Sequence, residues 1–322
     1  MRPDAGTPMI ELDNVSKSFG DAVAVDGISL NVPAGSLCVL VGTSGCGKST
    51  TLRMINRLIE HTGGEIRIDG HQIRRFNEVT LRRRIGYAIQ NTGLFPHWTV
   101  ARNIGVVPRL LKWDKARTRE RVESLMALLG LDVEAFAGKY PHQLSGGQAQ
   151  RVGVARALAA DPDILLMDEP FGALDPITRS SLQAELLRIQ SRIRKTIVFV
   201  THDMDEALRL ADQIVVMQAG RIIQQGTPSE ILAHPSDDFV ETLVGGRDRG
   251  LKRASLTPVG EMMESLPDDG RVPAVHVLQT DSMRLAVSLM LWHGVSQLAV
   301  VDDTGETVGM LPLRRLVDDF GE

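Results

Sequence analysis

The sequence predicts an α/β fold, and three observations lead to this class. Residues 37–41, 164–167 and 196–200 are continuous apolar runs, which is typical of parallel strands buried on both faces. The first run leads directly into a glycine-rich loop. Residues 50–58 follow that loop with Leu52, Ile55 and Leu58 at helical spacing. A strand, a loop and a helix in this order indicate a phosphate-binding unit at the start of the core.

The remaining elements follow in chain order. Residues 98–104, 117–129 and 146–160 have the patterns of helices, so a helical insertion is expected over about 91–161. Residues 215–223 predict a β-hairpin with Gly220 in its turn. Near the C-terminus, residues 298–311 predict strand, turn and strand. A helix over 283–292 is expected before them, and another from Leu313 after them.

Length and charge predict two domains. A chain of 322 residues exceeds one average domain, and from residue 254 onward eleven acidic residues face four arginines. Residues 245–250 have the composition of a linker. We expect a principal domain over 9–246, a linker over 247–254 and a small domain over 255–322. A net charge of −4 gives no basic footprint for nucleic acid.

Composition also bears on the compartment. No run approaches the length of a membrane span, and the first residues lack the apolar stretch of a signal peptide. We therefore expect a cytosolic protein that meets a membrane only through partners. The two cysteines do not suggest a disulfide framework: Cys38 lies in an apolar run and Cys46 lies in the glycine-rich loop.

The glycine-rich loop matches the phosphate-binding pattern G-x-x-x-x-G-K-[ST]. In this pattern backbone N–H groups surround phosphate oxygens, so a nucleoside triphosphate with Mg²⁺ is the expected ligand. Lys48 is expected to neutralise the β- and γ-phosphates and Ser49 to ligate Mg²⁺. The alternative, a glycine-rich turn without a ligand, is disfavoured by the flanking strand and helix. The expected binding residues are Gly42, Thr43, Ser44, Gly45, Cys46, Gly47, Lys48, Ser49 and Thr50.

Polar residues also stand where the other apolar runs end. Asp168 is expected to hold the Mg²⁺ shell through water, and Glu169 to polarise the attacking water. His202 could contact the γ-phosphate and orient that water, and Gln90 could reach both the metal and the water. An ordinary pair of strand-end carboxylates and a structural histidine are the alternatives.

A second glycine-rich element lies at residues 144–148, with Ser145, Gly146, Gly147 and Gln148. Two phosphate-binding elements about a hundred residues apart suggest two copies of the chain that close on shared nucleotides, each supplying what the other lacks.

With these motifs, residues 9–243 resemble an ATP-binding-cassette (ABC) ATPase, a P-loop NTPase core with antiparallel β elements and a helical insertion. The resemblance implies a head-to-tail homodimer in which Ser145, Gly146, Gly147 and Gln148 form the signature that grips ATP held by the other copy. By position, Gln90 matches the Q-loop, Asp175 the D-loop and His202 the switch histidine. Phe19 matches the aromatic residue that stacks on adenine, with a buried core Phe as the alternative. Val25 joins the expected ATP-binding set.

A closer resemblance is to ATPase subunits of importers for glycine betaine, choline and related osmoprotectants. It is carried by residues 56–60, 92–100 and 170–176. The resemblance implies a motor subunit at the cytoplasmic face of the inner membrane that contacts permease subunits through Leu94 to Val100. A separate solute-binding protein would capture the solute. A DNA-repair ATPase is disfavoured because no long heptad region is present, and a nucleotide sensor because Glu169 and His202 are intact.

The C-terminal segment resembles a single cystathionine-β-synthase (CBS) module, a small α+β domain that often binds adenine nucleotides and works in pairs. Pro312 and Arg315 stand where nucleotide binders usually have Thr or Ser and Asp. A regulatory role and a role in dimerisation both remain open for this module.

Overall fold

The computed structural model describes residues 8–89, 93–172, 174–266 and 272–315, and the chain forms two compact units that divide at Thr227 and Pro228. This division lies earlier than the 247–254 linker expected from composition. Those residues are instead largely helical, within η3 (Gly246–Asp248) and α12 (Arg249–Leu256). The physical reason is that α12 contributes buried Ala254 to the core of the second unit.

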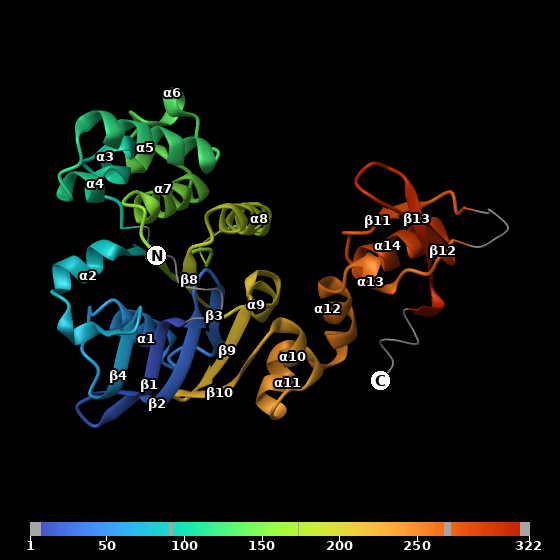
Figure 1. Cartoon of the computed structure of the whole chain (residues 1–322), viewed down its shortest axis with the longest axis horizontal. Coiled ribbons are helices and arrows are strands. Elements are labelled where there is room, and N and C mark those ends of the chain that lie inside the picture. The colour runs from blue at the N-terminus through green and yellow to red at the C-terminus, as the bar shows by residue number, and fades with distance from the viewer. Residues whose placement is uncertain (1–7, 90–92, 173, 267–271, 316–322) are drawn as a thin grey trace. The chain divides into compact units, whose positions relative to one another are not determined.

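The larger sheet of the first unit has the strand order β10-β9-β3-β8-β7-β6 (Figure 1). Strands β9, β3, β8, β7 and β6 are parallel, and β10 pairs antiparallel with β9 as the expected hairpin. Every residue of β3, β7 and β8 is buried, which confirms the three apolar runs as central strands. The bounds are β3 Leu37–Gly42, β6 Ile85–Ala88, β7 Ile164–Asp168, β8 Thr196–Thr201, β9 Gln213–Gln218 and β10 Arg221–Gly226.

A second, antiparallel sheet of the first unit has the order β2-β1-β4-β5. Its inward residues pack with α1 (Lys48–Ile55) and with the central strands in one apolar cluster, in which Ile10, Leu40, Leu52 and Leu166 are fully buried. This shared core fixes the loop before α1 against both sheets. The bounds are β1 Pro8–Phe19, β2 Ala22–Pro33, β4 Gly63–Ile68 and β5 His71–Gln72.

The helical insertion separates β6 from β7 in sequence, although the two strands are neighbours in the sheet. Its last helix, α7, lies directly on β6: a Cβ at Gly86 would come within 2.4 Å of the carbonyl oxygen of Ala157. All three helices expected in this region are present within a few residues of their predicted bounds. The insertion contains α3 Val100–Ile104, α4 Val106–Leu110, α5 Lys115–Leu128, α6 Val133–Phe136, η2 Pro141–Gln143 and α7 Gly146–Leu158 (Figure 1).

The other helices of the first unit accompany the sheets. Helix α8 begins at Pro176, a residue type that suits the first helical position, and is capped by Asp175, whose side chain accepts a hydrogen bond from the N–H of Thr178 at 3.0 Å. The bounds are η1 Ile73–Arg75, α2 Glu78–Arg84, α8 Pro176–Ile193 and α9 Met204–Leu210.

The second unit contains a three-stranded sheet in the order β11-β12-β13. Strands β12 and β13 form the expected strand-turn-strand, and α14 matches the helix expected at 283–292; the helix expected from Leu313 falls mostly outside the described residues. Leu298, Val300 and Met290 are buried together in its core. The unit contains α10 Pro228–Ala233, α11 Asp238–Val244, η3, α12, α13 Val259–Met262, β11 His276–Leu278, α14 Met283–His293, β12 Gln297–Val301 and β13 Thr307–Pro312. Among the described residues of both units, no helix is long and apolar enough to cross a membrane.

Candidate active site

The register of the parallel sheet brings the predicted site residues to one edge. Val41 is paired with Thr201 across β3 and β8, and Asp168 is paired with Val200 across β7 and β8. The glycine-rich loop, the Asp168–Glu169 pair and His202 therefore follow neighbouring strand ends. In open α/β sheets this carboxyl edge is where ligands bind.

The glycine-rich loop adopts a backbone path that larger residues would block. Gly42 has φ +153°, and a Cβ there would lie 2.0 Å from the carbonyl oxygen of Met217. Gly47 has φ +105°, and its Cβ would lie 2.7 Å from the carbonyl oxygen of Ala24. Gly47 is also the N-cap of α1 and provides no side-chain cap, so the first N–H groups of that helix are available to an anion.

Lys48 lies inside the loop rather than in solvent. Its Nζ donates hydrogen bonds to the carbonyl oxygens of Gly42 at 2.8 Å and Thr43 at 2.9 Å, and lies 3.6 Å from the Sγ of Cys46. The residue is only 5% exposed. Carbonyl groups offer a buried ammonium only partial negative charge, so a phosphate oxygen would be the stronger partner. The loop thus places a cation where the phosphate-binding pattern predicts one.

A hydroxyl and a carboxylate lie next to this cation. Ser49 Oγ donates a hydrogen bond of 2.7 Å to Asp168 Oδ1, which joins α1 to the end of β7. Tyr87 on β6 approaches the other oxygen, Asp168 Oδ2, at 3.5 Å. Burial and the negative charge of Asp168 raise the pKa of Tyr87. Hydroxyl and carboxylate oxygens are the donors that Mg²⁺ prefers, so this pair fits the metal expected from the sequence.

Glu169 and His202 form the second half of the site. Glu169 has φ +44°, a left-handed conformation that is uncommon for a residue with a side chain, and its N–H donates to the carbonyl oxygen of Val200 at 3.0 Å. Its Oε2 lies 3.4 Å from His202 Nδ1. The Glu169 side chain is 21% exposed and that of His202 is 58% exposed. Both groups are therefore close together and open to a ligand.

The second glycine-rich element forms the start of α7. Ser145 is the N-cap: its Oγ accepts from the N–H of Gln148 at 3.3 Å, and Gln148 Oε1 accepts from the N–H of Ser145 at 3.0 Å. This is a capping box that holds the turn in shape. Gly147 approaches α8 closely, because a Cβ there would lie 2.6 Å from Thr178 Cγ2. Among the described residues, Lys48 and Ser145 are not joined by a hydrogen bond: Lys48 bonds within its own loop and Ser145 within its own turn.

The remaining predicted residues lie as follows. Phe19 is 52% exposed at the end of β1, with Lys17 Nζ 4.7 Å from its ring centre, so it is not a buried core residue. Val25 is fully buried and packs against the glycine-rich loop, since a Cβ at Gly47 would lie 3.2 Å from Val25 Cγ2. Asp175 caps α8, and its hydrogen bonds from Thr178 lower its pKa. Gln90 lies outside the described residues.

The segment expected to meet permease subunits is a compact turn. Asn103, which is fully buried, accepts from the N–H of Phe95 at 2.8 Å and donates to the carbonyl oxygens of Phe95, Trp98 and Thr99. The rings of Phe95 and Trp98 lie 4.3 Å apart, and Phe95 is 39% exposed. One buried amide therefore fixes an exposed aromatic turn.

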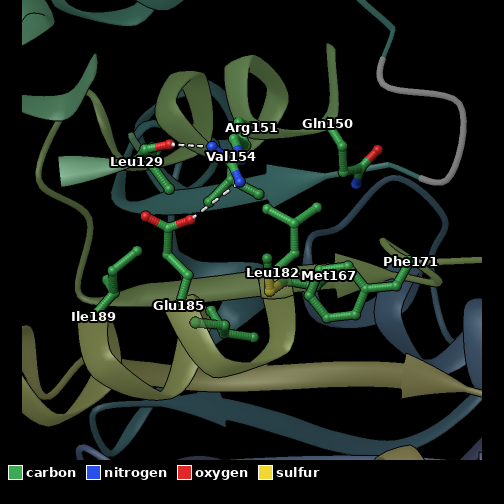
Figure 2. A pocket seen from close by; sticks show the side chains of 10 residues that line it. Leu129, Gln150, Arg151, Val154, Met167, Phe171, Leu182, Glu185 and Ile189 are labelled. Carbon is green, nitrogen blue, oxygen red and sulfur yellow. Dashed lines mark hydrogen bonds and ion pairs between the residues drawn. The ribbon is translucent and has the colours of Figure 1, made fainter. Parts of the chain in front are cut away.

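A small, largely apolar pocket lies between α7 and α8 (Figure 2). Figure 2 shows Arg151 above Glu185, with Met167 and Phe171 at the opposite end of the lining. Arg151 Nη1 donates to the carbonyl oxygen of Leu129 at 3.3 Å, and its Nη2 lies 3.7 Å from Glu185 Oε2. These contacts hold the end of the insertion against α8. Neither the contact between Arg151 and Glu185 nor Tyr87 beside Asp168 could be predicted from the sequence, because neither belongs to a linear motif.

The fold and this group of residues define an ATP-binding P-loop ATPase. The ABC transporter family matches residues 25–172. The chain is 52% identical to the glycine betaine uptake system ATP-binding protein YehX of Escherichia coli, over 96% of this chain and 99% of the relative. It is 48% identical to the choline transport ATP-binding protein OpuBA of Bacillus subtilis, over 92% of this chain and 76% of the relative.

Solved structures agree with this assignment. The bacterial ABC transporter cassette MJ0796, solved as a dimer, is 35% identical, with a TM-score of 0.62 over 68% of this chain and 99% of that chain. The same cassette was also solved in a post-hydrolysis state bound to ADP and Pi. The chain belongs to the ABC transporter family, as an ATP-binding subunit of the kind that dimerises and works with transmembrane permease subunits.

Proposed function

We propose that the chain is the ATP-hydrolysing motor subunit of an importer for quaternary-amine osmoprotectants of the glycine betaine and choline type. The observation that carries this proposal is the identity of about half of all residues over nearly the whole chain to subunits named for uptake of these solutes. A relative from Listeria monocytogenes, 45% identical, is named for transport of carnitine, which is also a quaternary amine.

ATP would bind at the carboxyl edge of the large sheet. Lys48 Nζ, which donates to the carbonyl oxygens of Gly42 and Thr43, would turn to the β- and γ-phosphates. Adenine would stack on the exposed ring of Phe19. Ser49 and Asp168 would hold Mg²⁺, together with Gln90 by its match to the Q-loop, and the metal would supply positive charge that neutralises the phosphates.

Hydrolysis would begin at Glu169. Its carboxylate would accept a proton from water as the water oxygen attacks the γ-phosphorus and the bond to the β-phosphate oxygen breaks. His202, whose Nδ1 lies 3.4 Å from Glu169 Oε2, would orient the water and the γ-phosphate. The left-handed backbone at Glu169 supports this role, because strained residues often occur at functional sites.

The complete site would need two copies. Ser145, Gly146, Gly147 and Gln148 would contact the γ-phosphate held by the other copy's Lys48, with Asp175 at the same interface. Among the described residues of one chain, the hydrogen bonds of Lys48 and of Ser145 stay within their own elements, which is consistent with a composite site. ATP would close this dimer and hydrolysis would reopen it.

The motor would act at the cytoplasmic face of the inner membrane as a peripheral subunit. The exposed aromatic turn from Leu94 to Val100, fixed by Asn103, would receive the permease, and a separate solute-binding protein would deliver the solute. The small domain, proposed over 255–322, would regulate the motor or hold the dimer together. Arg315, which lies 3.2 Å from Glu264 Oε1, occupies the position where a nucleotide binder would have a carboxylate.

Uptake measurements test this proposal. Cells that lack the chain should lose accumulation of labelled glycine betaine or choline, and the wild-type gene should restore it. A Glu169→Gln chain should be expressed at the wild-type level but should not restore uptake. Uptake that persists without the chain, or that returns fully with the Glu169→Gln chain, would refute the proposed function.

A further inference from the structure

Helix α8 is joined to the segment that carries His202 by a row of polar contacts. Arg179, Ser180 and Gln183 lie on one side of α8, at helical spacing. They meet three residues that follow β8 in the chain. Those residues are Asp203, Glu206 and Arg209.

Arg179 makes two of these connections with one guanidinium. Its Nη2 donates to the carbonyl oxygen of Leu174 at 3.1 Å, and its Nη1 lies 3.7 Å from Asp203 Oδ2. The Nε is buried without a hydrogen-bond partner. The side chain thus spans from the residue before Asp175 to the residue after His202.

Asp203 is held tightly on its own side. Its Oδ1 caps α9 by accepting from the N–H groups of Asp205 at 2.9 Å and Glu206 at 3.2 Å. Its own N–H donates to Thr201 Oγ1 at 3.0 Å. Since His202 lies between Thr201 and Asp203, the position of Asp203 constrains the backbone of His202.

A second set of contacts joins α8 to α9. Gln183 Nε2 donates to Glu206 Oε1 at 2.8 Å, and both residues are buried. Arg209 Nη1 donates to Gln183 Oε1 at 3.2 Å and to Ser180 Oγ at 3.0 Å. Of these residues Gln183 and Glu206 are buried, and a buried, hydrogen-bonded polar pair favours one arrangement of two helices.

The first turn of α8 also contacts the signature turn, which is formed by residues 145–148. A Cβ at Gly147 would lie 2.6 Å from Thr178 Cγ2, and one at Gly146 would lie 3.8 Å from Leu174 Cδ2. The residue next to Thr178 is Arg179. One helical turn therefore touches the signature on one side and the segment of His202 on the other.

We propose that Arg179 is a positioning residue, which ties the His202 segment to the first turn of α8 and so sets His202 opposite Glu169. This inference rests on the proposed roles of Glu169 and His202. Loss of the tie would leave nucleotide contacts at the glycine-rich loop intact, because none of the tied residues belongs to that loop. It would misplace the group that orients the attacking water.

The first test compares full-length chains with single substitutions. Arg179→Gln and Asp203→Asn should each lower kcat by about 3- to 30-fold, the range for a coupling of this type, and leave KM for ATP within about twofold. Asn at 203 keeps an oxygen that can cap α9, so the loss would report the contact with Arg179. The double variant should be no slower than the slower single variant.

Arg188→Gln is the matched control. It removes an arginine from the same helix, where Arg188 Nη2 lies 3.3 Å from Glu185 Oε1, but it does not touch the His202 segment. It should keep kcat near the wild-type value. An Arg179→Gln chain with unchanged kcat, or with losses that merely multiply in the double variant, would overturn the proposal.

The second test asks which copy needs Arg179. A Ser145→Arg chain mixed with a Lys48→Ala chain retains one intact composite site, whose Lys48 and His202 come from the Ser145→Arg chain. Arg179→Gln should lower turnover when placed in that chain and have little effect in the other. Equal losses in both placements would mean a general structural role. If the unmodified mixture is inactive, the composite site fails, whereas the single-chain test still decides on Arg179.

Discussion

The two glycine-rich elements of this chain both present a helix N-terminus, yet they are built differently. The loop at residues 42–50 holds its own buried cation, and backbone carbonyls within 2.7 Å of the Cβ positions of Gly42 and Gly47 exclude larger residues. The signature turn at residues 145–148 holds no cation among its members, and Ser145 caps its own helix. We therefore expect the first element to bind a phosphate by itself and the second to complete a site on another copy, as proposed above.

Steric limits on glycine differ in the same way. At Gly42 the obstacle is a backbone carbonyl, which cannot rotate away. At Gly147 it is the methyl group of Thr178, which a second substitution can remove. We therefore expect that Gly42 cannot be replaced by a larger residue, whereas Gly147 can be replaced if Thr178 is shortened as well. The following predictions test this contrast, from the largest expected effect to the smallest.

Lys48→Ala should reduce ATP turnover by about 10³-fold, comparable to the loss of a major electrostatic contact in a closed site. The phosphates lose the buried cation that the loop places beside the carbonyl oxygens of Gly42 and Thr43. The ATPase rate of the full-length variant measures this loss, and binding of labelled ATP shows whether the nucleotide is still held. Tight residual binding with unchanged turnover would mean that Lys48 does not carry the phosphate contact.

Glu169→Gln should slow hydrolysis by at least about 10²-fold while ATP still binds, because an amide cannot accept the proton of water. The variant should accumulate as a closed dimer with ATP and Mg²⁺, as judged by size in solution. The wild-type chain without ATP, expected to be mostly monomeric, is the control. A variant that hydrolyses at the normal rate would assign water activation to another residue.

Mixing Ser145→Arg with Lys48→Ala chains should restore part of the turnover that each lacks alone. One composite site in each mixed dimer combines an intact loop with an intact signature turn. The measurement is ATPase activity against mixing ratio, with each variant alone as the control. A mixture as inactive as its components would contradict sites shared between copies.

Gly147→Ala should lower turnover by about tenfold, since overpacking of this kind costs about 1–3 kcal/mol. Adding Thr178→Ser to the same chain should recover much of the loss, because it removes the obstructing methyl group. Gly42→Ala should not be rescued by any single side-chain change, because its obstacle is the carbonyl oxygen of Met217. If Thr178→Ser failed to restore turnover to Gly147→Ala, or a single side-chain change restored it to Gly42→Ala, the two elements would not differ in this way.

Phe19→Ala should raise KM for ATP by about three- to tenfold and leave kcat nearly unchanged, because aromatic stacking contributes about 0.5–1.5 kcal/mol. Phe19→Tyr, which keeps the aromatic face, should behave like wild type. An unchanged KM in Phe19→Ala would mean that the exposed ring does not stack on adenine.

Local patterns in the sequence determined much of this molecule. Apolar runs predicted the central strands, and the phosphate-binding pattern predicted the positions of Lys48 and Ser49. Both predictions were possible because backbone path and residue type are coupled over a few neighbouring residues. The strand, turn and strand near the C-terminus and the preceding helix were predicted for the same reason. The linker was predicted from composition alone. Composition does not show that Ala254 is buried in the core of the second unit.

Contacts between distant segments were decided only by the tertiary structure. The bond from Ser49 to Asp168, the approach of Tyr87, and the tie from Arg179 to Asp203 each join residues from different elements. Their meeting depends on strand register and helix packing, which are set by the whole core and leave no mark in a local pattern. The sequence by itself therefore predicted which groups are proposed to perform the chemistry, and the fold decided which residues hold those groups in place.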